Sequence, residues 1–434
     1  MANRRSFLKS ALLSAPATVF ASSGILGQAG APVAKKLTPN SIAVETLPLH
    51  FDVESGIHNL ENGYWGVMPR SVAQVYAEQT AFVTKTNSIW ARNVLPGGAC
   101  LSAGGREARE SVAAMVGALP EEIAITRSGS DALQQLITNY KHVKAGDAVI
   151  YCDLDYDAMI ASMDWLGDHR GAQVVKFAMP EPATTANILA AYEDVLKRTP
   201  NAKLLLVTQV SNRTGLVTPV KEIVTMARAR GVDTIVDIAH GVACLDFKID
   251  DLGCDFAGWS VHKWTSAPLG TGAMYIRKSR IDDIDIAYDN HDLPAHDITA
   301  RVPAGTVNFA AVLSIPSAVE FHYAVGGAAK EKHLRSLRDR WVDRVRELSN
   351  VEICVPDEPA RSCAITSFRL KGMRSNEDAQ QVQKVLFERY RVHTVWRKGV
   401  AKGPVIRVTP GLYSTFADCD ALAAALHKEH AMFA

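Results

Sequence analysis

The chain has 434 residues, of which 47% are hydrophobic and 21% charged, and its formal net charge is +1. This composition suits a soluble globular protein with one large core and a second, smaller domain. The near-neutral charge gives no basis for a nucleic-acid partner or an anionic membrane surface.

The N-terminal segment resembles an export signal. A double arginine followed by Ser-Phe-Leu-Lys occupies residues 4–9, and a moderately apolar stretch covers residues 11–26. Pro16 and several serines interrupt that stretch, so we expect no stable membrane insertion. The resemblance implies a twin-arginine signal peptide over residues 1–34, the Tat export machinery as a partner and a periplasmic location. The alternative is an unstructured basic N-terminus.

Between about residues 71 and 310, short apolar runs alternate with helical patterns. The runs lie at 148–152, 173–177, 203–207, 234–237 and 272–276. Helices are expected at 131–140 and 219–230, among others. This alternation predicts the α/β class, with a mostly parallel sheet covered on both faces.

After residue 315 the pattern changes to that of a small α+β domain. Helices are expected at 329–348, at 376–390 and after Phe416, with strands at 351–355 and 364–368. We therefore divide the mature chain into an N-terminal arm with a large domain, residues 35–315, and a linker helix with a small C-terminal domain, residues 316–434.

Ligands of an open α/β sheet bind beyond the carboxyl ends of its strands, and Asp237 and Lys263 are expected there. Asp237 ends the run at 234–237, and Lys263 follows Trp-Ser-Val-His at 259–262. Such a pair suits pyridoxal 5′-phosphate (PLP), because a lysine binds the cofactor as a Schiff base and a carboxylate keeps its pyridine nitrogen protonated. A lone lysine would be a surface cation, but its neighbours argue otherwise.

Further candidate groups follow other predicted strands, and each has a plainer interpretation. Gly129, with Ser130 or Asp131 capping the next helix, predicts a phosphate site or an ordinary N-cap. Tyr156 is suited to stack on a flat ring or to pack in a core. Asn212 is suited to donate to a ring oxygen or to form a turn.

Taken in this order, the motifs resemble those of class V aminotransferases, which are fold-type I PLP enzymes. The resemblance extends from residues 59–63 to a late arginine motif at 405–415. It is strongest to the isopenicillin N epimerase-like branch, which is also similar to exported enzymes that tailor the siderophore pyoverdine.

The resemblance assigns roles to individual residues. Lys263, Asp237 and Tyr156 would be catalytic, with Tyr156 stacked on the cofactor ring. The remaining cofactor contacts would come from Gly129, Ser130, the amide of Asp131, Asn212, His240, Ser260, His262 and, from the partner copy, Thr306. A contribution from Thr306 across subunits implies a homodimer with shared sites.

For the substrate, the resemblance implies a carboxylate clamp at Arg407. Asn62, beside Glu61, and residues 396–398 occupy regions where the family shapes its substrate pocket. Desulfurases of the family carry a nucleophilic cysteine shortly before the arginine, whereas residues 392–407 contain none. Cys363 lies too early and is expected to be a buried, inert thiol within an apolar strand. None of the seven cysteines has C-x-x-C spacing.

The expected chemistry starts with removal of the Cα proton by Lys263, whose pKa burial would lower. The substrate would be a small-molecule or short-peptide amino acid. An aminotransferase is the primary prediction; an epimerase, a C–S or β-elimination lyase and a non-catalytic binding protein remain alternatives.

Two rival classes fit the sequence poorly. A dehydrogenase would need G-x-G-x-x-G after a strand, which the early domain lacks. A metal hydrolase would have to use His291, Asp292, His296 and Asp297, whose spacing is not a known ligand pattern, so we predict a solvated loop and no metal.

Overall fold

The computed structural model describes residues 37–94, 101–290 and 292–434. The expected signal peptide at 1–34 and His291 lie outside these ranges. Within them, no single helix has the length and apolar composition to span a membrane. Phe309–Val325 and Gly327–Val345 meet those criteria only as a pair bent by 76°.

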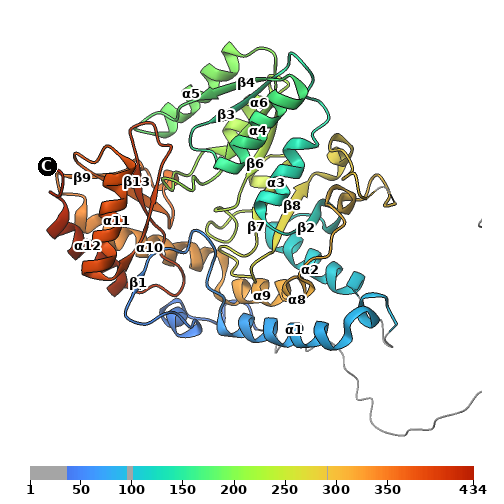
Figure 1. Cartoon of the computed structure of the whole chain (residues 1–434), viewed down its shortest axis with the longest axis horizontal. Coiled ribbons are helices and arrows are strands. Elements are labelled where there is room, and N and C mark those ends of the chain that lie inside the picture. Colours follow the sequence, from blue (N-terminus) through green and yellow to red (C-terminus); the bar gives the residue numbers. More distant parts are fainter. Residues whose placement is uncertain (1–36, 95–100, 291) are drawn as a thin grey trace, which may run out of the picture.

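A seven-stranded sheet forms the centre of the larger body, in the order β2-β8-β7-β6-β5-β3-β4 (Figure 1). The strands are β2 (Ile123–Thr126), β3 (Ala148–Cys152), β4 (Gln173–Phe177), β5 (Ala202–Thr208), β6 (Asp233–Asp237), β7 (Phe256–Ser260) and β8 (Gly272–Ile276). β8 is antiparallel to both its neighbours, and the other pairs are parallel. The predicted mostly parallel sheet is therefore confirmed.

Alternate side chains of each strand enter cores on opposite faces of the sheet. Leu204 and Leu206 of β5 pack with α3 (Gly129–Thr138) and α4 (Asp157–Arg170). Leu205 and Val207 belong to the core of the other face, which includes side chains of α2 (Leu101–Val116), α5 (Thr185–Arg198) and α6 (Val220–Arg228). Burial on both faces explains why the strands are continuous apolar runs in the sequence.

Three further helices, α1 (Arg70–Ala91), α8 (Phe309–Leu313) and α9 (Ile315–Val325), pack against one another along one side of the larger body (Figure 1). α9 begins at Ile315, next to the predicted start of the smaller domain at residue 316, yet it packs against α1, α2 and α8 of the larger body. A short α7 covers Ile249–Leu252. Short 3-10 helices lie at Val44–His50, Pro120–Glu122, Lys278–Asp283, Ile298–Arg301 and Pro359–Arg361.

The smaller body contains a four-stranded antiparallel sheet in the order β12-β13-β10-β9. Its strands are β9 (Val351–Ile353), β10 (Thr366–Leu370), β12 (Val395–Arg397) and β13 (Val405–Val408). They share a core with α10 (Gly327–Val345), α11 (Asn376–Tyr390) and α12 (Phe416–Glu429).

Cys363 precedes β10, so its expected place within a strand is wrong. The segment just before β10, residues 361–363, contacts the larger body. The Arg361 carbonyl accepts from the Val217 amide at 3.0 Å, and Cys363 Sγ lies 3.5 Å from the Gly215 carbonyl. The N-terminal arm also reaches the smaller body. Its strand β1 (His58–Asn59) pairs in parallel with β11 (Val392–His393).

Candidate active site

The turn between β2 and α3 forms a cradle for an anion. Ser128 caps α3, because its Oγ accepts from the Asp131 amide at 3.1 Å. The Gly129 amide donates to Ser260 Oγ at 3.0 Å, which ties this turn to the end of β7. A Cβ at position 129 would lie 2.7 Å from the Trp259 carbonyl carbon, so the close approach requires glycine. The helix N-terminus adds the positive end of its dipole, which favours a phosphate.

The prediction that Ser130 or Asp131 caps this helix is wrong. Ser128 is the residue with extended backbone directly before the helix, so its hydroxyl takes that position. The Asp131 carboxylate pairs instead with Arg127, with Nη2 and Oδ1 3.1 Å apart. Ser130 lines the pocket described next, whereas Asp131 does not.

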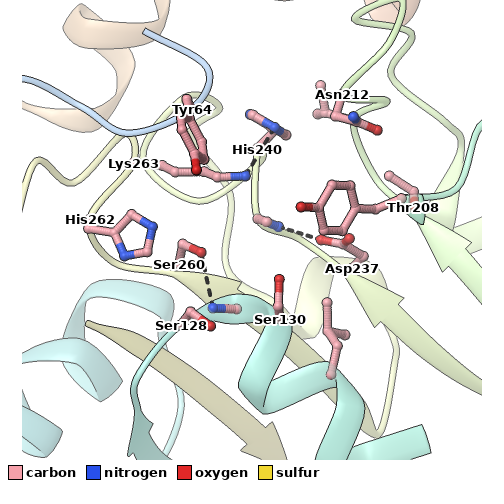
Figure 2. A pocket seen from close by; sticks show the side chains of 15 residues that line it. Tyr64, Ser128, Ser130, Thr208, Asn212, Asp237, His240, Ser260, His262 and Lys263 are labelled. Carbon is pink, nitrogen blue, oxygen red and sulfur yellow. Dashed lines mark hydrogen bonds between the residues drawn. The ribbon is translucent and has the colours of Figure 1, made fainter. Parts of the chain in front are cut away.

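One pocket of about 190 Å³ lies where the carboxyl ends of β5, β6 and β7 meet the N-termini of α3 and α4 (Figure 2). Nine residues expected from the sequence line it together: Gly129, Ser130, Tyr156, Asn212, Asp237, His240, Ser260, His262 and Lys263. Tyr64 and Thr208 also line the pocket, although the sequence patterns did not indicate them. Thr208 could have been found, because it directly follows the apolar run at 203–207, and ligands bind beyond the carboxyl ends of such strands.

Lys263 presents its amine to the centre of the pocket. Nζ lies 3.2 Å from Nε2 of His240 (Figure 2). Burial lowers the pKa of Lys263 to about 8; Asp237 opposes this shift, and the charge of Arg407 adds to it. At pH 7 about a tenth of the amine is therefore uncharged and able to act as a nucleophile, far more than for an exposed lysine.

Asp237 places a buried carboxylate at the end of β6. Its side chain is 5% exposed and accepts a hydrogen bond from the Ala239 amide at 2.9 Å. Burial raises the pKa of Asp237, and the amide bond and Lys263 partly offset that rise. Because burial disfavours an isolated carboxylate, a protonated ring nitrogen is a suitable partner for it.

Two side chains on the pocket wall are suited to hold a flat, polar ligand. Tyr156 is 37% exposed, which excludes the core packing considered from the sequence and leaves its ring face available. The Asn212 side-chain oxygen is buried and has no hydrogen-bond partner among the described residues. Such an atom is explained when a ligand supplies the missing bond.

His262 lies at the anion end of the pocket. Its Nδ1 is 2.8 Å from the Thr271 carbonyl, which can only accept, so Nδ1 carries a proton. Burial lowers the pKa of His262, and the bond to Thr271 opposes this effect.

Arg407 adjoins the pocket rather than lining it. It is 1% exposed; its Nη2 lies 2.5 Å from Glu61 Oε1, and its Nη1 donates to the Asn212 carbonyl at 2.8 Å. Gly63 lies against the guanidinium, because a Cβ there would be 2.7 Å from Cζ. The neighbouring Asn62 is 4% exposed, and its backbone amide donates to the Thr409 carbonyl at 2.9 Å.

A second arginine, Arg397, stands on the same sheet face as Arg407. In the antiparallel register Val395 pairs with Arg407 and Arg397 pairs with Val405, so both arginines occupy one side of the β12–β13 ladder. Within the described residues the Arg397 guanidinium has no hydrogen bond or ion pair, and its Nε is buried. Burial, and next the charge of Arg407, lower the pKa of Arg397 to about 10.

Other candidates lie away from the pocket. Thr306 is on an exposed loop and does not line the pocket of its own chain. Cys363 is buried, in agreement with the predicted inert thiol, and is also absent from the pocket wall. Around residue 291, Tyr288 is 90% exposed and Asp297 caps a 3-10 helix. The described ranges contain no group of three or more His, Cys, Asp or Glu side chains able to hold a metal.

Comparison with known proteins agrees with this geometry. The sequence model of "Aminotransferase class-V" matches residues 70–422. Isopenicillin N epimerase from Streptomyces clavuligerus is 28% identical over 337 residues, which cover 74% of this chain and 83% of the relative.

Solved structures agree on the fold. A cysteine desulfurase from Escherichia coli has a TM-score of 0.75 at 20% identity and covers 91% of this chain and 100% of its own. A structure of C-DES with glycine covalently linked to its PLP cofactor has a TM-score of 0.73 at 18% identity, covering 86% of this chain and 96% of its own. The anion cradle, the buried carboxylate and the facing lysine fit that cofactor, and we conclude that the chain belongs to the class V aminotransferase family of PLP-dependent enzymes.

Proposed function

We propose that the protein transfers the amino group of an amino acid, free or at the end of a short peptide, by chemistry at Cα. The observation that carries this proposal is the position of Lys263, whose amine faces Asp237 across a pocket with an anion cradle at one end. Bound there, PLP withdraws electrons from Cα and so acidifies its proton.

Each residue has a defined task in this proposal. Gly129, Ser130 and the N-terminus of α3 hold the phosphate, and Tyr156 supports the ring face. The Asp237 carboxylate keeps a proton on the ring nitrogen. Lys263 would hold the cofactor covalently through Nζ, and its uncharged amine, once free, would take the Cα proton of the substrate.

Amino-group transfer is favoured because it needs only one base. The Lys263 amine alone would serve both to take the Cα proton and to return it. Epimerisation would need a proton donor on the opposite side of Cα, for which the pocket offers the hydroxyls of Tyr64 and Tyr156. The similarity to isopenicillin N epimerases makes epimerisation the second candidate. Desulfuration by a cysteine nucleophile is disfavoured, since no cysteine among the described residues lines this pocket.

The substrate carboxylate is assigned to Arg407, with Arg397 beside it. Arginine holds carboxylates through paired N–H donors, and both guanidinium groups lie close enough to influence the charge of Lys263. The substrate amine would then lie near Lys263. The substrate side chain would point toward the open part of the pocket.

The test is incubation of the PLP-loaded enzyme in D2O with L- and D-amino acids and short peptides. A keto product, formed catalytically when a keto acid is added, supports transfer. Deuterium at Cα with inversion and no keto product supports the epimerase. Lys263→Ala is the control, and it should fold, lose borohydride-stable attachment of the cofactor and lose at least about 1,000-fold of the rate, because it lacks both nucleophile and base. A Lys263→Ala enzyme with wild-type turnover would contradict the proposal.

We also propose that the enzyme works as a homodimer and is exported. Tyr288 and Tyr64 are 90% and 68% exposed, and the exposed Thr306 loop is available to reach the phosphate of a second copy. Sedimentation of the wild type should give twice the chain mass.

Replacement of Arg4 and Arg5 by lysine should keep the folded, PLP-loaded enzyme in the cytoplasm, whereas unchanged export would exclude the twin-arginine route.

A further inference from the structure

Trp264 makes a buried contact with the ring of His240. The Nε1 of Trp264 lies 3.2 Å from Nδ1 of His240, and the two residues are 2% and 4% exposed. An indole N–H can donate but cannot accept. Nδ1 of His240 is therefore the acceptor and carries no proton.

The opposite ring nitrogen of His240 faces the reacting end of the pocket. Its Nε2 lies 3.2 Å from Nζ of Lys263. Burial lowers the pKa of His240 well below its usual range, and the charges of Lys263 and Arg407 lower it further. The ring is thus neutral, and a neutral imidazole has one N–H group, here at Nε2.

We propose that Trp264 fixes His240 in the Nε2–H form, which makes His240 a permanent hydrogen-bond donor toward the uncharged amine of Lys263 and toward a bound cofactor. A histidine in this form has no lone pair at Nε2, the nitrogen beside Lys263, so it cannot compete with Lys263 for the substrate proton. Trp264 is a positioning residue, since it acts through His240. The inference deepens the proposed function and rests on it for the role of Lys263.

The position of the protons can be observed directly, without turnover. In a neutron crystal structure of the PLP-loaded enzyme exchanged into D2O, we expect deuterium on Trp264 Nε1 and on His240 Nε2, with none on His240 Nδ1. Deuterium on His240 Nδ1 would overturn the proposal. If the expected pattern appears but no amino acid is turned over, the proposed function fails while this inference stands.

A pair of matched substitutions tests the consequence. Trp264→Phe keeps an aromatic ring but removes the donor, so His240 can shift its proton to Nδ1 and lose the bond to the cofactor. We expect the Kd for PLP to rise about 5- to 10-fold, as for one lost buried hydrogen bond, and the visible absorption maximum of the bound cofactor to shift.

Trp341→Phe is the control, because Trp341 is also buried but its indole N–H has no partner among the described residues. Trp341→Phe should change neither the Kd for PLP nor the absorption maximum of the bound cofactor. Equal behaviour of the two variants would contradict the role of Trp264. If Trp264→Phe does not fold, the neutron experiment on the wild type still decides.

Discussion

Glu61 Oε1 lies 2.5 Å from Nη2 of Arg407, so the arginine assigned to the substrate carboxylate is already paired with a carboxylate of the chain. Both side chains are largely buried: Arg407 is 1% exposed and Glu61 is 10% exposed. Glu61 also accepts from Thr409 Oγ1 at 3.1 Å, which holds it in place. A substrate carboxylate must therefore share Arg407 with Glu61 or displace it.

We expect Glu61→Gln to lower the KM for a carboxylate substrate about 3- to 10-fold, because the competing negative charge is removed. The same change should lower the free energy of unfolding by about 1–3 kcal/mol, since the buried Arg407 charge loses its partner but keeps a hydrogen bond. Steady-state kinetics and urea unfolding measure the two effects. Glu388→Gln, at an exposed glutamate, is the control. A higher KM in Glu61→Gln would show that Glu61 itself contacts the substrate.

Arg397 presents the opposite situation, a partly buried cation with no partner among the described residues. We expect Arg397→Gln to raise the KM by about 10-fold, as for the loss of one charge-assisted contact. Thermal stability should stay equal or rise, because an unpaired desolvated charge is removed. The exposed Arg374→Gln serves as the control. If Arg397→Gln binds substrate as the wild type does, Arg397 has another role.

Gly129→Ala should weaken the cradle. The new methyl would lie 2.7 Å from the Trp259 carbonyl carbon and 2.8 Å from the Ser260 amide. We expect a loss of about 1–3 kcal/mol in unfolding free energy from this overpacking, together with weaker PLP binding. Gly105→Ala is the matched control, because a Cβ there meets nothing within 4 Å. Equal PLP affinity in both variants would show that the approach to β7 does not shape the site.

Lys330 provides a pH-dependent contribution to stability. It is 2% exposed, its Nζ donates to the Trp264 carbonyl, and burial lowers its pKa to about 7. An unfolded lysine has a pKa of about 10.4. Between these values the unfolded chain binds the proton that the folded chain does not, so stability rises with pH by up to about 1.4 kcal/mol per unit.

Below pH 7 the full cost of charging buried Lys330 is present. We expect Lys330→Met to remove this slope between pH 7 and 10, which unfolding curves at several pH values measure. Lys332→Met, at an exposed position on the same helix, should keep the wild-type slope. Parallel stability profiles for the wild type and Lys330→Met would contradict the assignment.

Features determined by neighbouring residues were predictable from the sequence. The runs at 148–152, 173–177 and 272–276 have the bounds of β3, β4 and β8. β3 and β8 are buried throughout, as continuous apolar runs predict, whereas β4 lies at the sheet edge and is partly exposed. The order of motifs also located Asp237 and Lys263, since strand ends of one sheet meet at one edge. The sequence did not identify Ser128 as the cap, because polar residues at 128, 130 and 131 all compete for that position and only the backbone path decides.

Contacts between distant segments could not be predicted in the same way. The Glu61–Arg407 pair joins residues 346 positions apart. Arg397 has no partner because no acceptor among the described residues reaches its guanidinium. The Trp264–His240 bond depends on how the turn after β7 folds back over the end of β6. These features carry the expected specificity of the site, and each depends on how separate segments of the chain pack together.

The pairing of β1 with β11 also has a consequence for biogenesis. Residues 58–59 find their partners only at residues 392–393, so the smaller body and the arm that carries Glu61 cannot form until nearly the whole chain has left the ribosome. Contacts of such long sequence separation slow folding and expose intermediates to aggregation. In a chain that stops before β11, we therefore expect the arm that carries Glu61 to have no strand with which to pair. We expect such a chain to depend on chaperones for solubility.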